Sequence, residues 1–413
     1  MKIAIINLGC KVNQCECDSI AARMMSYGYE VVQEFVPADV YVINTCAVTQ
    51  EAEKKSRQCV ARVRKYNPDA KVYVIGCASQ KNPEQFANKG VTYIGGCGNK
   101  QAVCELGEGV HVEPLPTTFE TLDFGKGTHA RECVKIQDGC NNFCSYCIVP
   151  YLRGRARSRS IDDILCECRL RALTAHEIVL TGINVSAYGK DIGSSLVELV
   201  RALKGIPVHF RFGSLEAGVI EPKLLRAMKD GGHFCPHFHL SLQSGSDEVL
   251  RAMNRHYTAK EFAGKVALIR DYFPLAAITT DVIVGFATET KEQFEESLAF
   301  VESMGFAGIH VFPYSRRQGT KAYSLAPIPA DEINERVARM TKVKEASAKA
   351  FIHSFIGYEL EVVTETADGM YMQGHTENYI KIYLPSAETC KVNQKYRVRC
   401  LAPYQDGMLA ERI

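Results

Sequence analysis

The chain has no tryptophan among its 413 residues, and it has no long hydrophobic run. Its first residues, MKIAIINLGC, lack the extended apolar region of a secretory signal peptide, and no apolar stretch is long enough to span a bilayer. A net charge of only +2 gives no sign of the strong basic excess of many nucleic-acid-binding proteins. We therefore expect a cytoplasmic protein with reduced thiols and no membrane partner.

Cysteine, by contrast, is abundant, with seventeen residues. A disulfide framework is typical of small secreted domains and does not suit a chain of this length. The cysteines are therefore expected to be metal ligands or buried packing residues. The length and a 46% hydrophobic content indicate two or three well-packed domains.

Three of these cysteines, Cys140, Cys144 and Cys147, lie four and then three positions apart, directly after a predicted strand at 132–137. Thiolates are soft ligands, and this spacing lets one short loop hold three corners of an iron–sulfur cube. With no fourth cysteine nearby, one iron would be open to a substrate or cofactor. Structural zinc, which usually takes four protein ligands, and chance spacing are the alternatives.

The first 122 residues alternate short apolar strands with helical patterns, which predicts a parallel sheet with covering helices. The strands are expected at 3–8, 40–44, 71–76 and 91–94, with helices at 19–27 and 49–66. Cys10, Cys46 and Cys77 each follow one of the first three strands, at the edge where α/β sheets bind ligands. We predict a second three-cysteine cluster there, against the alternative that small thiols pack well beside strand ends. The other cysteines of this segment are expected on helix faces, in loops or in the core: Cys15, Cys17, Cys59, Cys97 and Cys104.

Six strand-then-helix units follow, which predicts a partial (β/α)6 barrel. The strands are expected at 132–137, 177–182, 209–215, 237–243, 278–286 and 308–314. The Cys140 loop follows the first strand, on the side where such barrels carry catalytic groups. Polar groups follow other strands at Asn184, Ser214, Glu216 and Gln243.

Alternating arginines lie just past the cysteine loop at Arg153, Arg155 and Arg157. A solvated charged segment is one interpretation. Contact with phosphate or carboxylate near the active site is the other, because a guanidinium binds both bidentately.

From Gly357 onward the hydrophobic period becomes two, and five short strands are separated by turn residues. This pattern predicts a small closed antiparallel barrel, the plan of oligonucleotide-binding folds. Its tyrosines, with Lys395 and Arg397, could stack bases and contact phosphates of RNA. Tyrosines are also ordinary strand residues, so this RNA contact stays an alternative.

The motifs together resemble the radical S-adenosylmethionine methylthiotransferases. The matching stretches are LGCKVNQ, INTCAVT, VIGC, QDGCNNFCSYCIVPYLRGRARSR, LTGINVSAYG, LSLQSGSDEVLRAMNRHYT, DVIVGF and VFPYSRRQGT. This resemblance implies a multidomain α/β protein with a cluster domain at 1–122, a radical domain at 123–350 and a TRAM barrel at 351–413.

The resemblance also implies two [4Fe–4S] clusters, one on each cysteine triad, and S-adenosylmethionine as radical source and methyl donor. Asn184, Ser214, Glu216 and Gln243 would contact this cofactor, and an external reductant such as flavodoxin or ferredoxin and a sulfur source would be needed. LGCKVNQ resembles the branch that acts on N6-threonylcarbamoyladenosine beside the anticodon of tRNA. Isopentenyladenosine in tRNA, a ribosomal protein side chain, or RNA binding without catalysis are the alternatives.

The chain departs from the family pattern at three positions. Ala287 and Thr288 replace a proline and a glycine after DVIVGF, and Ala217 replaces a proline after Ser-Leu-Glu. All three adjoin strand ends where the cofactor is expected.

Overall fold

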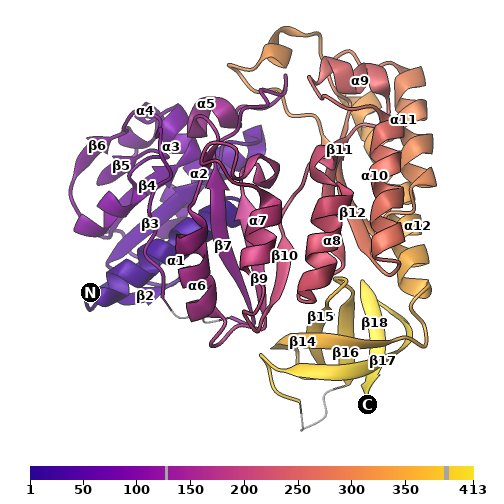
Figure 1. Cartoon of the computed structure of the whole chain (residues 1–413). Helices are drawn as coiled ribbons and strands as arrows, with labels where there is room; N and C mark the ends of the chain where they lie inside the picture. The colour runs from indigo at the N-terminus through magenta and orange to yellow at the C-terminus, as the bar shows by residue number, and fades with distance from the viewer. Residues whose placement is uncertain (126–128, 386–389) are drawn as a thin grey trace.

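A computed structural model describes residues 1–125, 129–385 and 390–413. It arranges the chain as an N-terminal α/β unit, a central open barrel of parallel strands and a small C-terminal β-barrel (Figure 1). The C-terminal barrel lies below the central strands in this view. The predicted multidomain α/β fold class is thereby confirmed.

The N-terminal unit is a six-stranded sheet in the order β2-β1-β3-β4-β5-β6, and every neighbouring pair is parallel. Its strands are β1 (Lys2–Asn7), β2 (Glu30–Val32), β3 (Val40–Thr45), β4 (Lys71–Gly76), β5 (Tyr93–Gly95) and β6 (Gly109–His111). Its helices are α1 (Lys11–Ser26), α2 (Gln50–Val63), α3 (Cys77–Lys81) and α4 (Glu84–Ala87). The parallel sheet was predicted, but β2 and β6 were missed because each has only three residues.

Helix α1 begins at Lys11, eight residues before the expected start. Its first turns bury the polar side chains of Asn13 and Glu16. Buried polar residues break the apolar periodicity by which an amphipathic helix is found in a sequence. These two residues belong to the site described below.

The central unit has its six predicted parallel strands. They are β7 (Arg131–Asp138), β9 (Glu177–Gly182), β10 (His209–Phe212), β11 (His237–Gln243), β12 (Ala277–Val284) and β13 (Gly308–Pro313). Strands β7, β9 and β10 form one sheet with the short antiparallel β8 (Arg157–Ser158), and β11, β12 and β13 form another. Parallel bridges at Phe210–Phe234 and Leu215–Leu240 join the two sheets. The result is a partial barrel.

Helices cover the outside of this barrel (Figure 1). They are α6 (Ile161–Arg171), α7 (Leu196–Ala202), α8 (Pro222–Gly231), α10 (Ala259–Tyr272), α11 (Lys291–Ser303) and α12 (Ala330–His353), with the short α5 (Val149–Arg153) and α9 (Asp247–Ala252) at the strand ends. On β11, Leu240 and Leu242 are buried in the core, whereas His239 and Ser241, which alternate with them, are only half-buried. Because side chains alternate along a strand, the half-buried set faces the barrel interior.

The C-terminal unit is a closed barrel, as predicted, and its strand order is β14-β15-β16-β18-β17. Its strands are β14 (Glu359–Ala367), β15 (Tyr371–Thr376), β16 (Lys381–Pro385), β17 (Lys395–Tyr404) and β18 (Gly407–Arg412). The expectation of purely antiparallel pairing was wrong for one pair, because β16 and β18 run parallel. This pair closes the barrel between strands that are not joined by a single turn.

This small barrel docks against the amino ends of the central strands. The Tyr379 ring lies 4.8 Å from the guanidinium of Arg211 and 5.0 Å from that of Arg131. Arg131 also pairs with Glu365 of β14 at 2.8 Å. Tyr379, one of the tyrosines expected to stack bases, therefore belongs to the contact between the two barrels.

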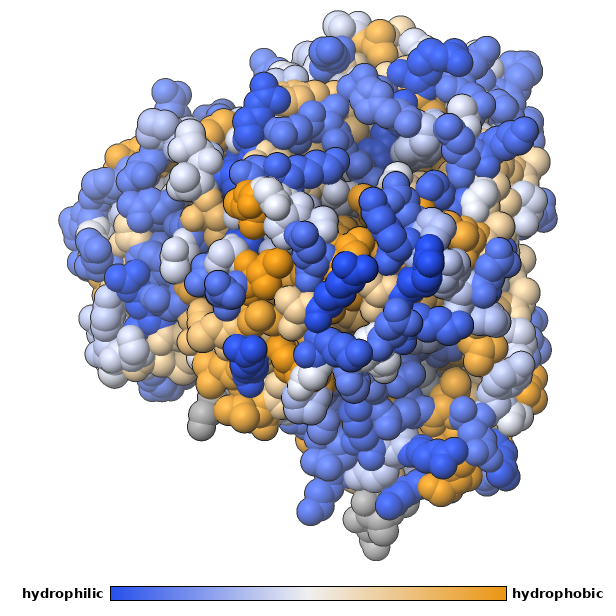
Figure 2. Space-filling view, in the orientation of Figure 1, coloured by the Kyte–Doolittle hydropathy of each residue, from blue (hydrophilic) through white to orange (hydrophobic). Residues whose placement is uncertain are grey.

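In the described part of the chain, no helix combines the length and the apolar character needed to cross a membrane. The face seen in Figure 2 is mostly hydrophilic, with apolar residues in separate small groups.

Candidate active site

The Cys140–Cys147 loop leaves β7 through Gly139, whose φ is +69°. A side chain there would bring a Cβ within 2.0 Å of the Arg155 carbonyl, so only glycine allows this turn. The amide of Asn254 donates to the carbonyls of Asn142 and Phe143 at 3.1 and 3.2 Å, which fixes the middle of the loop. The loop conformation is thus set by residues more than one hundred positions away.

Two side chains donate hydrogen bonds to the sulfur atoms of this loop. Nη1 of Arg255 lies 3.3 Å from Sγ of Cys144, and Nδ2 of Asn184 lies 3.6 Å from Sγ of Cys140. Donors of this kind stabilise the negative charge of cluster thiolates and tune the cluster's potential. The donor set of three thiols with two sulfur-directed donors fits a [4Fe–4S] cluster.

Cys147 follows Cys144 in a tight turn, in which the amide of Cys147 donates to the carbonyl of Cys144 at 3.0 Å. Burial, together with the negative charges of Cys144 and Cys140, raises the pKa of Cys147 to about 12. Such a thiol loses its proton when a metal binds, because the metal ligand is the thiolate.

A cleft of about 180 Å³ lies beside this loop, lined by Asn142, Glu216, Gly218 and residues 254–257. Glu216 accepts a hydrogen bond from Asn142 and forms a 3.2 Å ion pair with Arg255. The carboxylate and the guanidinium therefore face one small space next to the cysteines. This space suits a zwitterionic ligand such as the amino-acid end of S-adenosylmethionine.

The four predicted cofactor contacts take different places around this cleft. Glu216 lines it, and Asn184 contacts Cys140. Ser214 and Gln243 lie at the ends of β10 and β11 and are not among its lining residues. Their contact with the cofactor stays a prediction. Arg255 was not named as a site residue, although it lies in the motif LSLQSGSDEVLRAMNRHYT.

Cys10, Cys46 and Cys77 lie at the carboxyl ends of β1, β3 and β4, which are neighbours in the sheet. Burial, together with the charges of Cys77 and Cys10, raises the pKa of Cys46 to about 11. The amide of Asn13 donates to Asn44 at 2.7 Å, and Asn13 accepts from Cys10 Sγ at 3.3 Å. These buried amides fix the edge on which the triad sits.

A fourth thiol, Cys97, lies 3.8 Å from Cys77, sulfur to sulfur. It was expected to be a packing residue, and it follows β5 at the same sheet edge, a signal that was present in the sequence. The hydrogen bond from Cys97 and the charge of Arg153 lower the pKa of Cys77 to about 6. The lowered pKa favours the thiolate of Cys77, the form that binds metals.

Arg153 links the two cysteine triads. Its Nη1 lies 2.9 Å from Glu16 and 3.2 Å from Asp138, and its Nε donates to Cys77 at 3.4 Å. Asp138 is the last residue of β7 and accepts from the amide of Gly139 at 2.7 Å, immediately before the Cys140 loop.

Two lysines complete this buried network. Lys100 and Lys135 pair with Glu16 at 3.1 and 3.0 Å, and Lys135 also pairs with Asp138 at 2.6 Å. Burial alone would raise the pKa of Glu16, but the charges of Arg153, Lys100 and Lys135 hold it well below its usual range. The two domains are therefore joined by ionised groups that have no access to water.

The arginine segment corrects one prediction. Arg153 and Arg157 are buried, and Arg157 donates to the carbonyls of Arg153 and Arg155 at 2.7 and 2.8 Å. Both side chains are held inside the protein, although the buried Nε of Arg157 has no hydrogen-bond partner among the residues that the structure describes, so they do not form an RNA surface. Arg155 is exposed, with its guanidinium 4.6 Å from the Phe143 ring of the cysteine loop.

On the C-terminal barrel, Lys395 pairs with Glu361 at 2.8 Å and Arg397 with Glu359 at 3.2 Å. The Arg397 side chain is 71% exposed, so it is accessible despite this pair. Contact of either residue with RNA stays a prediction.

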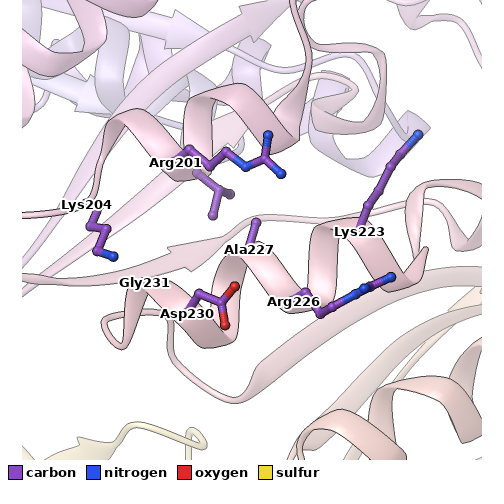
Figure 3. A pocket seen from close by; sticks show the side chains of 8 residues that line it. Arg201, Lys204, Lys223, Arg226, Ala227, Asp230 and Gly231 are labelled. Carbon is purple, nitrogen blue, oxygen red and sulfur yellow. The ribbon is translucent and has the colours of Figure 1, made fainter.

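A larger groove of about 510 Å³ lies between α7 and α8, outside the barrel (Figure 3). Arg201, Lys204, Lys223 and Arg226 line it, with Asp230 as the single carboxylate. No cysteine is among the described residues that line this groove, so the larger cavity is not the candidate active site. Its charge suits a phosphate backbone.

Ala287 and Thr288, which stand where the family pattern has proline and glycine, lie in a tight turn after β12. The amide of Glu289 donates to the carbonyl of Phe286 at 2.9 Å, and the third residue of the turn, Thr288, has φ +73°. This is the pattern of a type II turn, which favours proline and glycine at the positions held here by Ala287 and Thr288. The turn forms in this chain without them. Ala217, the other departure, is buried at the first position of a short 3₁₀ turn.

Two family models match the chain. The radical SAM superfamily model matches residues 134–301, and the model of an uncharacterized family, UPF0004, matches residues 2–96. Among solved structures, the radical S-adenosylmethionine methyltransferase TsrM from Kitasatospora setae has a TM-score of 0.58 at 14% identity, covering 78% of this chain and 77% of that one. This likeness supports the fold.

Curated relatives extend over the whole chain. The threonylcarbamoyladenosine tRNA methylthiotransferase MtaB of Chlamydia pneumoniae is 36% identical, covering 99% of this chain and 97% of the relative. The MtaB protein of Bacillus subtilis is 34% identical, covering 100% of this chain and 97% of the relative. The tRNA-2-methylthio-N(6)-dimethylallyladenosine synthase of Acetivibrio thermocellus is 34% identical, covering 86% of this chain and 79% of the relative. This chain therefore belongs to the methylthiotransferase family of radical S-adenosylmethionine enzymes.

Proposed function

We propose that this protein attaches a methylthio group to C2 of N6-threonylcarbamoyladenosine, next to the anticodon of tRNA. The product is 2-methylthio-N6-threonylcarbamoyladenosine. The observation that carries the proposal is the buried Arg153, which contacts both Cys77 and Asp138 and so holds a second cysteine triad beside the radical site. Full-length relatives with that activity in their names support the choice of substrate.

Each cysteine triad is proposed to hold one [4Fe–4S] cluster. When bound beside Cys140, the cluster supplies the electron that cleaves S-adenosylmethionine for removal of hydrogen from C2, a carbon with no acidic proton. Arg255 donates a hydrogen bond to Sγ of Cys144 and, with Glu216, would hold the amino-acid end of the cofactor in the cleft. Asn184, Ser214 and Gln243 are proposed to contact the rest of the cofactor.

Cys10, Cys46 and Cys77 would hold the auxiliary cluster that carries the sulfur to be inserted. Arg153 and Cys97 favour the thiolate of Cys77 for this purpose. A second S-adenosylmethionine provides the methyl group, and a reductant such as flavodoxin or ferredoxin and a sulfur source complete the reaction. We propose that the reaction takes place in the cytoplasm.

Arg155, Lys395 and Arg397 are the exposed or partly exposed cations proposed to contact the RNA backbone. The target base must leave the anticodon-loop stack to reach the cleft, at a cost of a few kcal/mol, roughly as in base flipping. Phosphate contacts of this kind would offset part of that cost.

Iron analysis and nucleoside analysis test the proposal. Anaerobically reconstituted protein should contain about eight irons per chain, and a Cys10→Ala, Cys46→Ala, Cys77→Ala variant about four. Mass spectrometry of tRNA nucleosides from a deletion strain should show loss of the methylthio-threonylcarbamoyl nucleoside. Its persistence would contradict the proposed substrate.

A second candidate is methylthiolation of isopentenyladenosine in tRNA, favoured by the relative from Acetivibrio thermocellus. The same nucleoside analysis distinguishes the two substrates, because the deletion strain would then lose the methylthio-isopentenyl product instead. A protein side chain as substrate would leave both nucleosides in place. An RNA-binding protein without catalysis would keep its function when Cys140 is replaced by alanine.

A further inference from the structure

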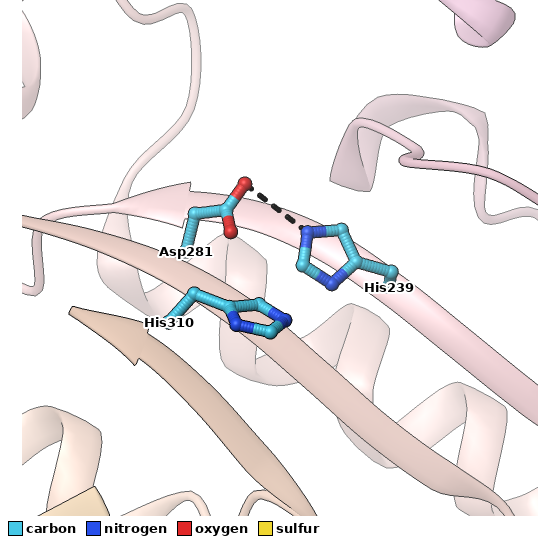
Figure 4. A group of neighbouring side chains, drawn as sticks. All are labelled: His239, Asp281 and His310. Carbon is cyan, nitrogen blue, oxygen red and sulfur yellow. Dashed lines mark ion pairs between the residues drawn. The ribbon is translucent and has the colours of Figure 1, made fainter. Parts of the chain in front are cut away.

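A polar cluster inside the central barrel contains none of the cysteines of either triad. His239, Asp281 and His310 come from the adjacent strands β11, β12 and β13 and face one another (Figure 4). Nε2 of His239 lies 3.1 Å from Asp281, and Nδ1 of His239 lies 2.9 Å from Thr279 Oγ1. His239 is thus held in place by neighbours on both sides of its ring.

The other members of the cluster point into open space. His310 is exposed, its ring centroid is 5.5 Å from that of His239, and in the described ranges it forms no hydrogen bond. The side chain of Asp281 is 25% exposed. The cluster therefore offers a free imidazole and a carboxylate oxygen to a molecule in the barrel interior.

Lys11 adds a positive charge to this space from the N-terminal domain. It follows Cys10 directly, it is exposed, and among described residues it forms no ion pair. Helix α1 begins at Lys11 and packs against β7 and β9 of the same barrel. Partial burial lowers the pKa of His310 against the raising effect of Asp281, and the charges of His239, Lys344 and Lys11 add to the lowering. Burial and the charges of Arg211, His239 and Lys11 lower the pKa of His237 on β11. Lys11 is therefore on the barrel side of the N-terminal unit, within electrostatic reach of β11 and β13.

These groups match one kind of ligand. An ammonium and an imidazole bind a carboxylate, while the Asp281 carboxylate accepts from a neighbouring N–H or O–H. The threonylcarbamoyl substituent carries all three features: a carboxylate, ureido N–H groups and a hydroxyl. An isopentenyl substituent carries none of them.

We propose that Lys11, His310 and Asp281 bind the carboxylate-bearing N6 substituent of the target adenosine and select it over apolar substituents. This proposal rests on the proposed function. The ligand atoms of His239, Asp281 and His310 lie within 4.8 Å of one another and could instead hold a divalent ion. The nearby positive charge of Lys11 disfavours a second cation, so the carboxylate is the better-matched occupant.

The test compares two anticodon stem-loop RNAs, one with threonylcarbamoyladenosine and one with its neutral methylamide. Binding to the anaerobic holoenzyme with S-adenosylmethionine is measured by fluorescence anisotropy, and products by mass spectrometry. We expect the wild type to bind the carboxylate form about tenfold more tightly. Lys11→Met and His310→Gln should lose most of this preference, and Lys11→Arg should retain it.

The matched controls are Lys54→Met on α2 and His353→Gln on α12, both exposed and far from the barrel interior in sequence. Iron content is measured for every variant, because Lys11 adjoins Cys10. His310→Gln is distant in sequence from both triads and tests the site even if Lys11→Met loses iron.

Equal binding of the two RNAs by a wild type that methylthiolates the threonylcarbamoyl form would overturn the substituent site and leave the proposed function intact. Modification of an isopentenyl hairpin alone would overturn the proposed function, and this inference with it. A stoichiometric divalent ion retained by the wild type and lost in His310→Gln would assign the cluster to a metal instead.

Discussion

The guanidinium Nε of Arg153 donates a hydrogen bond to Sγ of Cys77 over 3.4 Å, although the two residues are 76 positions apart. The other end of the same guanidinium contacts Asp138, whose carboxylate fixes the start of the Cys140 loop. One side chain thus positions parts of both candidate clusters. Sulfur insertion next to a radical site requires such proximity, because the two reacting groups must meet at one carbon.

Replacing Arg153 by methionine should therefore damage both the fold and the N-terminal triad. Removal of one partner from a buried ion network costs about 3–5 kcal/mol, because Glu16 and Asp138 lose a shared cation. Urea unfolding followed by circular dichroism measures this loss, and iron analysis should show that about half of the metal is gone. The exposed Arg155→Met variant is the control, and an Arg153→Met protein with normal stability and iron would contradict the assignment.

Arg255→Gln should lower the reduction potential of the radical cluster. The reduced cluster carries one more negative charge, and Arg255 stabilises it through Cys144. Loss of one charge-assisted hydrogen bond corresponds to roughly 60 mV for a one-electron couple. A redox titration followed by electron paramagnetic resonance measures the potential, with the exposed Arg251→Gln on α9 as the control. An unchanged potential would show that Arg255 does not stabilise the reduced cluster.

Thr288→Gly should stabilise the protein. Thr288 has φ +73°, a left-handed conformation that costs a β-branched residue about 1–2 kcal/mol. Glycine removes this strain but loses more backbone entropy on folding, so a net gain of about 0.5–1 kcal/mol is expected. The thermal midpoint should rise by a few degrees, as measured by calorimetry or circular dichroism. A matched Thr290→Gly variant should instead destabilise, because Thr290 caps α11.

The Glu177–Arg211 pair should make stability depend on acid pH. Burial would raise the pKa of Glu177, but the hydrogen bond and charge of Arg211 lower it from 4.5 to about 2. The contribution is complete above about pH 4.5 and is lost as the pH falls toward 2, and it amounts to roughly 3 kcal/mol. Urea unfolding of cluster-free protein between pH 5.5 and 3 should show a flatter pH dependence for Glu177→Gln than for wild type. Glu359→Gln on the exposed face of β14 should keep the wild-type slope.

Much of the fold could be predicted because periodicity is local. The alternation of apolar strands with helical patterns specifies parallel units, and the change to a period of two after Gly357 specifies the terminal barrel. Short strands and helices with irregular patterns were not predicted correctly in this way. The three-residue β2 has too few positions to show a period, and α1 begins in buried polar residues such as Glu16.

The candidate site was predicted less completely. Cysteine spacing identifies candidate ligands within one loop, because residues only three or four positions apart must lie close together. The second triad was predicted from the position of its cysteines at strand ends. Arg153 and Arg157 were predicted to contact RNA phosphates because a guanidinium binds phosphate bidentately. Only the partner carboxylates, contributed by α1 and β7, explain why they are buried.

The sequence alone determined the candidate ligands, the parallel strands and the terminal barrel, since each depends on residue type and short-range spacing. The tertiary structure decided which distant groups meet. It brought Cys97 to Cys77, Arg255 to Cys144, and His310 to His239 and Asp281 inside the barrel. The physical reason is that buried charges and sulfur ligands are stabilised by partners in space, and chain distance does not constrain which partners those are.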